Sequence, residues 1–141
     1  YLSGDKKAMS KDSIRCMELF KTKASCIVCH SGANLTDNSF HNLGTKSTDE
    51  GRVKVINDKS LNGAFKTPGL RNIALSAPYL HDGSLKTLEE VIIFYNKGGE
   101  KSKNKSNLIR PLNLNKKEIS QLVAFLNSLT EKIKIDKPII P

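Results

Sequence analysis

Tryptophan is absent from this 141-residue sequence, and aromatic residues make up only 6% of it. Few rings are therefore available to stack on nucleic-acid bases. The lysines are scattered or lie in the loop-like stretch 97–107, so the composition argues against a nucleic-acid partner. The formal net charge of +9 is suited instead to attracting an acidic partner.

Long apolar runs are also missing. None approaches the roughly 20 residues that a membrane-spanning helix requires, so we predict no membrane span. The chain begins YLSGDKKAMS, without an initiator methionine or the apolar core of a signal peptide. We therefore expect a processed product or a piece of a longer protein, and the length is sufficient for one domain.

Cysteine is scarce, and two of the three cysteines lie in the pentapeptide CIVCH, residues 26–30. A structural zinc site needs four nitrogen or sulfur ligands, normally as two pairs, whereas Cys16, His41 and His81 are scattered. A thioredoxin-like dithiol is expected beside a βαβ pattern, which this sequence does not show. C-x-x-C-H is the attachment signal of c-type haem. An interaction module with free thiols is the remaining alternative.

Haem attachment gives the chemically active residues of the pentapeptide a role. One turn of helix presents the thiols of Cys26 and Cys29 to the two vinyl groups on one porphyrin edge, so both residues become thioether anchors. The imidazole of His30 then reaches the iron as the proximal ligand. Because haem c is attached outside the cytoplasm, we expect a periplasmic or otherwise extracytoplasmic protein.

Helical periodicity is clearest near the two ends of the chain. It predicts three helices, within residues 9–23, 87–99 and 115–129. Ser10 is the expected start of the first helix, and capping boxes beginning at Thr87 and Asn115 are expected to start the other two. Cys16 and Met17, inside the first helix, are expected in the core.

The stretch between the first and second predicted helices reads mostly as loop, because Gly, Pro, Asn and Asp recur every few residues. Residues 52–56 alternate but are too few to build a sheet. A long irregular stretch needs something to organise it, and a large buried cofactor would do so. We therefore predict an all-α, class I cytochrome c-like domain whose long loops wrap around a covalently bound haem c. Residues 131–141 are expected to form a tail packed along the surface.

The second axial ligand is left open by the residues alone. Small cytochromes c use a methionine well after the histidine, but Met9 and Met17 both precede the attachment site. The downstream candidates are the side chains of His41, His81, Tyr79 and Tyr95. The position could also be vacant.

Three segments resemble the C-terminal haem domain of bacterial di-haem cytochrome c peroxidases and MauG. They are residues 19–44, 63–99 and 122–130, and TPGLRNIALSAPYLHDGSLKTLEEV is the most specific part. The resemblance implies that Tyr95 is the distal iron ligand, because it stands where the family places a methionine or tyrosine. His81 is implied to lie in a turn near the haem rather than on the iron. Arg71 is a candidate partner for a haem propionate.

The resemblance also implies a calcium ion, held partly by the backbone carbonyls of Ser76 and Pro78. An asparagine that the other haem domain contributes in the family is not in this chain. A tryptophan that MauG uses between its haems is missing as well, since Ala24 occupies the corresponding region before Cys26.

Family members have two haem domains, whereas this chain has one C-x-x-C-H. The resemblance therefore implies that residues 1–141 are a single cytochrome c domain, the C-terminal half of a di-haem peroxidase-like protein, without the N-terminal haem domain. Its implied function is to pass electrons from a small redox donor protein to a peroxidatic haem in the other half or in a second chain. The parent protein would be a peroxidase-like oxidoreductase, and this chain alone would transfer electrons only. The alternative is a free-standing mono-haem electron carrier.

Overall fold

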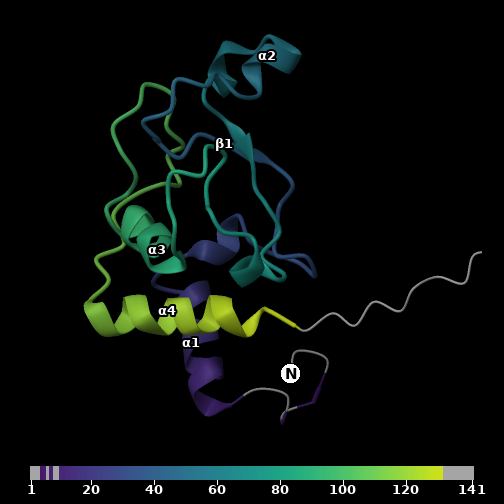
Figure 1. Ribbon diagram of the computed structural model, residues 1–141, viewed down its shortest axis with the longest axis vertical. Coiled ribbons are helices and arrows are strands. Elements are labelled where there is room, and N and C mark those ends of the chain that lie inside the picture. The colour runs from purple at the N-terminus through teal and green to yellow at the C-terminus, as the bar shows by residue number, and fades with distance from the viewer. Residues whose placement is uncertain (1–3, 6, 8–9, 132–141) are drawn as a thin grey trace, which may run out of the picture.

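The computed structural model describes residues 4–5, 7 and 10–131. Four α-helices are found there: α1 (Lys11–Lys21), α2 (Val53–Ile56), α3 (Leu88–Asn96) and α4 (Lys116–Ser128). Three short 3-10 helices lie between them: η1 (Cys26–Val28), η2 (Lys59–Leu61) and η3 (Ile73–Leu75). In Figure 1, α4 lies across α1, with α3 on its other side. The tail predicted for residues 131–141 lies almost entirely outside the described residues.

The starts of the three predicted helices are confirmed by their capping hydrogen bonds. The Ser10 side chain accepts from the Ser13 amide at 3.1 Å. Thr87 and Asn115 each take part in a reciprocal capping box with a glutamate three residues later. These bonds satisfy amides that the first turn of a helix leaves unpaired.

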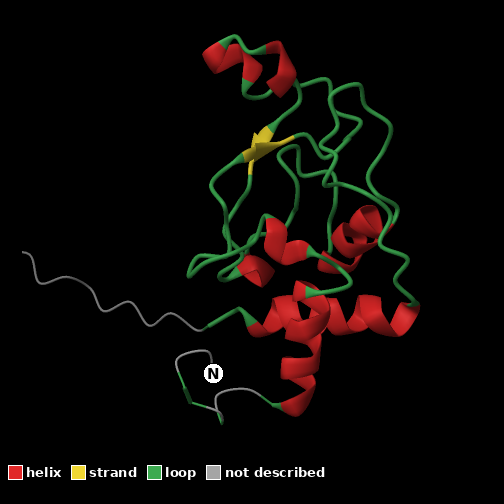
Figure 2. Cartoon of the chain, turned by 180° about the vertical axis from the view of Figure 1, so that it is seen from behind, coloured by secondary structure: helices red, strands yellow, loops and turns green. Residues whose placement is uncertain are grey.

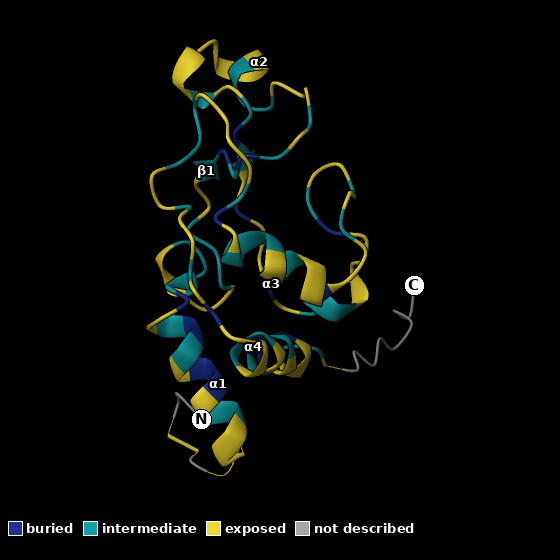
Figure 3. Ribbon diagram, turned by 90° about the vertical axis from the view of Figure 1, so that its left-hand side faces the viewer, coloured by how far each residue is buried: buried dark blue, intermediate teal, exposed yellow. Residues whose placement is uncertain are grey.

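The core lies where α4 packs against α1 and α3. Leu122 on α4 is fully buried, and the rings of Phe20 and Phe125 approach to 5.0 Å between centroids. Cys16 and Met17 belong to this core, as predicted. Figure 3 shows buried residues on α1 where it meets α4. The three-helix frame is therefore set by an amphipathic face on each main helix.

The region between α1 and α3 is mostly loop, and it extends away from the three-helix frame (Figure 2). It contains one small antiparallel sheet, β1 (Phe40–His41) with β2 (Phe65–Lys66). The all-α prediction therefore needs correcting to a helix-rich fold with a small sheet, because two-residue strands leave no alternation to detect. In the alternating stretch 52–56, the last four residues form the short helix α2 and not a strand.

Several loop residues adopt left-handed backbone angles, among them Ser25, Leu35 and Asn72.

Within the described residues, no helix is both long and apolar enough to cross a bilayer.

Candidate functional site

A cavity of about 520 Å³ lies between the helices and the long loops. Apolar side chains form most of its wall, including Phe20, Leu70, Leu88, Val91, Ile92 and Leu126. No aspartate or glutamate is among the described residues that line it. A concave, mainly apolar space of this size is typical of a cofactor site.

The pentapeptide enters this cavity through a tight turn. Ser25 has a left-handed backbone (φ 52°), and η1 begins at the next residue. The amide of His30 donates to the carbonyl of Cys26 at 2.9 Å, which continues the turn. Cys26, Cys29 and His30 consequently all line the cavity.

Both thiols are in an environment that favours the neutral form. Burial raises the pKa of Cys26 to about 12 and raises that of Cys29, to which the nearby Asp37 charge contributes. Reactive cysteines normally have lowered pKa values. The site therefore gives no support to a redox dithiol.

His30 is oriented by one hydrogen bond. Its Nδ1 lies 2.9 Å from the carbonyl oxygen of Leu35, and a carbonyl only accepts, so Nδ1 carries the proton. This tautomer leaves Nε2 with a free lone pair, as a metal-binding imidazole requires. Burial lowers the pKa of His30, which favours the neutral ligand form.

Tyr95 reaches the same cavity from α3. Burial raises the pKa of its phenol, and the neighbouring Cys26 and Cys29 raise it further. Within the described residues, its hydroxyl makes no hydrogen bond. The phenol is therefore available to a cation that could stabilise its ionised form.

The other axial candidates also line the cavity, but their polar atoms are engaged or exposed. The Tyr79 hydroxyl donates to the Ile73 carbonyl at 3.2 Å. His41 Nε2 lies 2.9 Å from a carboxylate oxygen of Asp37. His81 is exposed, and its ring stacks on Phe65 with centroids 3.5 Å apart. The place of His81 near a haem stays a prediction.

Arg71 does not line the cavity. Its Nε donates to the carbonyl of Ala33 at 2.7 Å, and the side chain is exposed. The structure therefore gives no support to the contact between Arg71 and a propionate. Ser76 and Pro78 are exposed and contribute to the cavity wall. Their role as calcium ligands stays a prediction.

Asp37 and His41 form a pair that the sequence reading did not identify. Although desolvation opposes ionisation of Asp37, hydrogen bonds from His41, Ser39 and Thr67 lower its pKa to about 2. The Asp37 amide also donates to the Cys29 carbonyl at 2.7 Å, so the pair supports the attachment turn. Ligand atoms of Cys29, Asp37 and His41 lie within 4.8 Å of one another. The only sequence signal was the spacing of four residues between the acid and the histidine.

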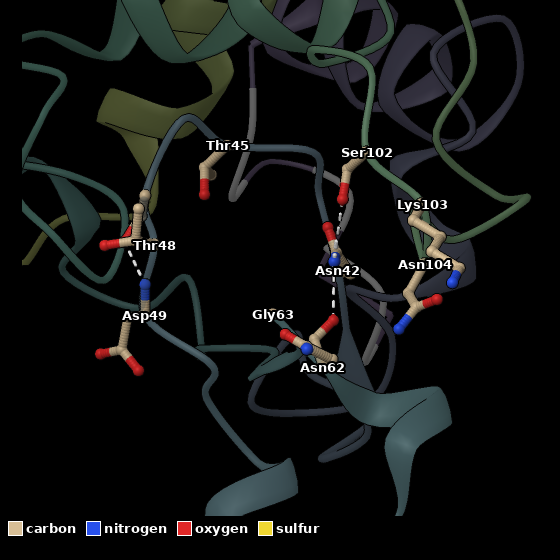
Figure 4. Close-up of a pocket in the computed structure, with 10 residues that line it drawn as sticks. Asn42, Thr45, Thr48, Asp49, Asn62, Gly63, Ser102, Lys103 and Asn104 are labelled. Atoms are coloured by element: carbon tan, nitrogen blue, oxygen red, sulfur yellow. Dashed lines mark hydrogen bonds between the residues drawn. The ribbon is translucent and has the colours of Figure 1, made fainter.

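A second, polar pocket of about 210 Å³ adjoins the first, because Thr45 and Gly63 line both. Asn42 is buried there and donates from Nδ2 to the Asn62 carbonyl at 2.8 Å and to the Ser102 hydroxyl at 3.3 Å (Figure 4). The polar side chain of Asn42 is thus hydrogen-bonded within the protein. Its bond to Ser102 connects loops 42–49 and 102–104.

The residues brought together at the large cavity fit a c-type haem. Two thiols and a neutral imidazole with a free Nε2 come from one turn, and a phenol comes from α3. This donor set, in an apolar cavity, is typical of a haem protein of the c type.

Comparisons with known proteins agree. The family model described as "Di-haem oxidoreductase, putative peroxidase" matches residues 59–129. The methylamine utilization protein MauG of Methylorubrum extorquens is 42% identical over 142 residues, covering 98% of this chain and 40% of that protein. The cytochrome-c peroxidase IdrP1 of Denitromonas iodatirespirans is 35% identical over 173 residues, covering 99% of this chain and 46% of that protein.

A solved structure, that of a MauG-like protein associated with microbial copper homeostasis, matches with a TM-score of 0.81 and 34% identity. The match covers 88% of this chain and 48% of that chain. This chain belongs to the di-haem cytochrome c peroxidase and MauG family of haem-containing oxidoreductases. The resemblance identified from the sequence is thereby confirmed. The chain spans less than half of the length of each of these relatives.

Proposed function

We propose that this chain is a c-type haem electron-transfer domain of a di-haem peroxidase-like oxidoreductase. In this proposal it is a single class I cytochrome c-like domain with one covalent haem. It receives electrons from a small redox donor protein and passes them to a peroxidatic haem in another domain or chain. The observation that carries the proposal is the single cavity lined by Cys26, Cys29, His30 and Tyr95.

Each of these residues has a separate task. Cys26 and Cys29 form the thioether bonds that fix the cofactor, which, when bound, supplies one-electron transfer. His30 would hold the iron through Nε2, because its Nδ1 proton is held by the Leu35 carbonyl. The apolar wall excludes water from the site.

Tyr95 is the proposed distal ligand. Its raised pKa means that the phenol keeps its proton until a cation lies beside the oxygen. Ligation therefore requires the phenol to release that proton. As an anionic oxygen ligand, Tyr95 would favour oxidised iron and so lower the reduction potential. If His30 and Tyr95 both held the iron, peroxide would have no place to bind it.

The proposal also includes a cellular compartment and a calcium ion. Attachment of haem c places the protein in the periplasm or an equivalent compartment. The proposal includes a calcium ion at the backbone carbonyls of Ser76 and Pro78, two exposed residues, because carbonyl oxygens suit Ca²⁺. The other haem domain would complete its ligands.

The test is peroxide-dependent oxidation of a reduced cytochrome donor by the haem-loaded chain. We expect the donor and the chain to exchange electrons, but peroxide turnover to stay well below about 10 per second, a typical enzyme rate. Turnover at that rate by the chain alone would contradict the electron-transfer assignment. Turnover that appears only when the other haem domain is added would exclude the free-standing carrier.

A further inference from the structure

Arg110 is the one formally charged side chain of the cavity wall that has no partner within the described residues. The wall contains two lysine or arginine residues, Lys66 and Arg110, and no described acidic residue. No hydrogen bond or ion pair of the Arg110 guanidinium is found in the described part of the chain. A cation beside an apolar cavity without a local counter-charge is suited to an anionic group of the occupant.

The competing cations are already engaged. Lys66 Nζ donates to the Asn38 side chain at 2.8 Å, and Arg71 donates to the Ala33 carbonyl at 2.7 Å. Arg71 does not line the cavity, and Lys66, which does, already donates a hydrogen bond to Asn38. Arg110 lines the cavity and its guanidinium makes no hydrogen bond among the described residues.

The backbone around Arg110 is fixed against the end of α3, the helix that carries Tyr95. Asn96 accepts the Leu112 amide on its carbonyl at 3.2 Å and the Leu114 amide on its side chain at 2.8 Å. Gly98 has φ +80°, and a Cβ there would lie 2.9 Å from the Arg110 carbonyl carbon. The α3 end therefore holds the loop in a defined place.

Arg110 is exposed, so the paired group lies at the rim of the cavity. A carboxylate costs less free energy at such a rim than in the apolar interior. Haem carries two carboxylates, its propionates, and a guanidinium binds a carboxylate through two parallel hydrogen bonds. We propose that Arg110 is the positioning residue that binds a haem propionate, and that its charge raises the reduction potential of the iron. This inference rests on the proposed haem site.

The expected effect follows from charge. An ionised propionate stabilises the more positive ferric form, and a paired cation offsets that stabilisation. The substitution Arg110→Gln should lower the equilibrium constant for reduction of the iron about tenfold, which lowers the reduction potential by about 59 mV for one electron. Arg110→Lys should restore most of the loss.

The experiment is a spectroelectrochemical titration of the haem-loaded variants. Lys66→Gln, Arg71→Gln and the remote, exposed Arg15→Gln are charge-matched controls, and each should shift the potential much less than Arg110→Gln. A shift in Arg71→Gln or Lys66→Gln that equals or exceeds that of Arg110→Gln would overturn the inference. So would an unchanged potential in Arg110→Gln.

If Arg110→Gln fails to acquire haem, Arg110→Lys carries the test through the propionate bending band in its resonance Raman spectrum. That band should move relative to the parent protein in Arg110→Lys and stay in place in Arg71→Lys. An unmoved band would overturn the inference. Absence of covalent haem in the parent chain would instead contradict the proposed function, so the two failures are distinguishable.

Discussion

His30 and Tyr95 face one cavity with complementary chemistry at the scale of single residues. One is a neutral imidazole whose Nδ1 proton is fixed on the Leu35 carbonyl, and the other is a phenol without a hydrogen bond among the described residues. Tyr79 is the natural comparison. It lines the same wall, but its hydroxyl donates to the Ile73 carbonyl.

This difference leads to a direct prediction. Tyr95→Phe should remove the phenolate bands from the resonance Raman spectrum of the ferric protein, because no oxygen remains at that position. Tyr79→Phe should keep those bands and lose about 1 kcal/mol of stability with its hydrogen bond. Phenolate bands that survive in Tyr95→Phe would assign the ligand elsewhere.

Asp37 predicts an acid-dependent stability. Its pKa falls from 3.8 to about 2 in the folded protein, so it binds a proton more readily when unfolded. The stability it contributes is present above about pH 4 and is lost as the pH falls towards 2. Denaturant unfolding at a series of pH values should therefore show a flatter acid limb for Asp37→Asn than for the parent. Superimposable limbs would mean that the pair with His41 does not form in solution.

At the scale of elements, the three main helices and the loop character of the stretch between the first two were predictable, whereas the path of those loops was not. Ser10, Thr87 and Asn115 are local signals, because a capping side chain bonds to amides within the next three residues. The strand pair Phe40–His41 and Phe65–Lys66 joins residues far apart in sequence, and two-residue strands show no period.

The same distinction explains which site residues were found. Cys26, Cys29 and His30 lie in one pentapeptide, so their spacing alone indicated the site. The charge of Arg71 made it a candidate for a propionate, but its distance from the cavity wall depends on the loop fold, in which its Nε donates to the Ala33 carbonyl. Arg110 lies in the long loop between α3 and α4, and the packing of that loop on the end of α3 holds it at the cavity.

The packing of α4 on α1 and α3 gives a prediction about stability. Leu122→Ala should cost roughly 2–5 kcal/mol, because Leu122 is fully buried and its neighbours cannot fully close the space. Leu75→Ala removes the same atoms from a residue that is 71% exposed, so its effect should stay within about 0.5 kcal/mol. Both values come from denaturant unfolding of the haem-loaded protein. Similar losses in the two variants would contradict this core.

At the scale of the whole molecule, the net charge bears on which redox donor the chain would accept electrons from. The net charge of +9 favours an acidic donor, and the rate of electron exchange with such a donor should fall as salt is added. The chain spans less than half of the length of these relatives, and the peroxidatic reaction is proposed for another haem domain and not for this chain.

The most direct measurement is the intact mass and pyridine haemochrome spectrum of the chain after export through a cytochrome c maturation pathway. The account predicts one covalently attached haem per chain, and its loss when Cys26 and Cys29 are both replaced by alanine. Cys16→Ala, a change in the α1 core, should keep the haem. A correctly matured chain without covalent haem would contradict the account.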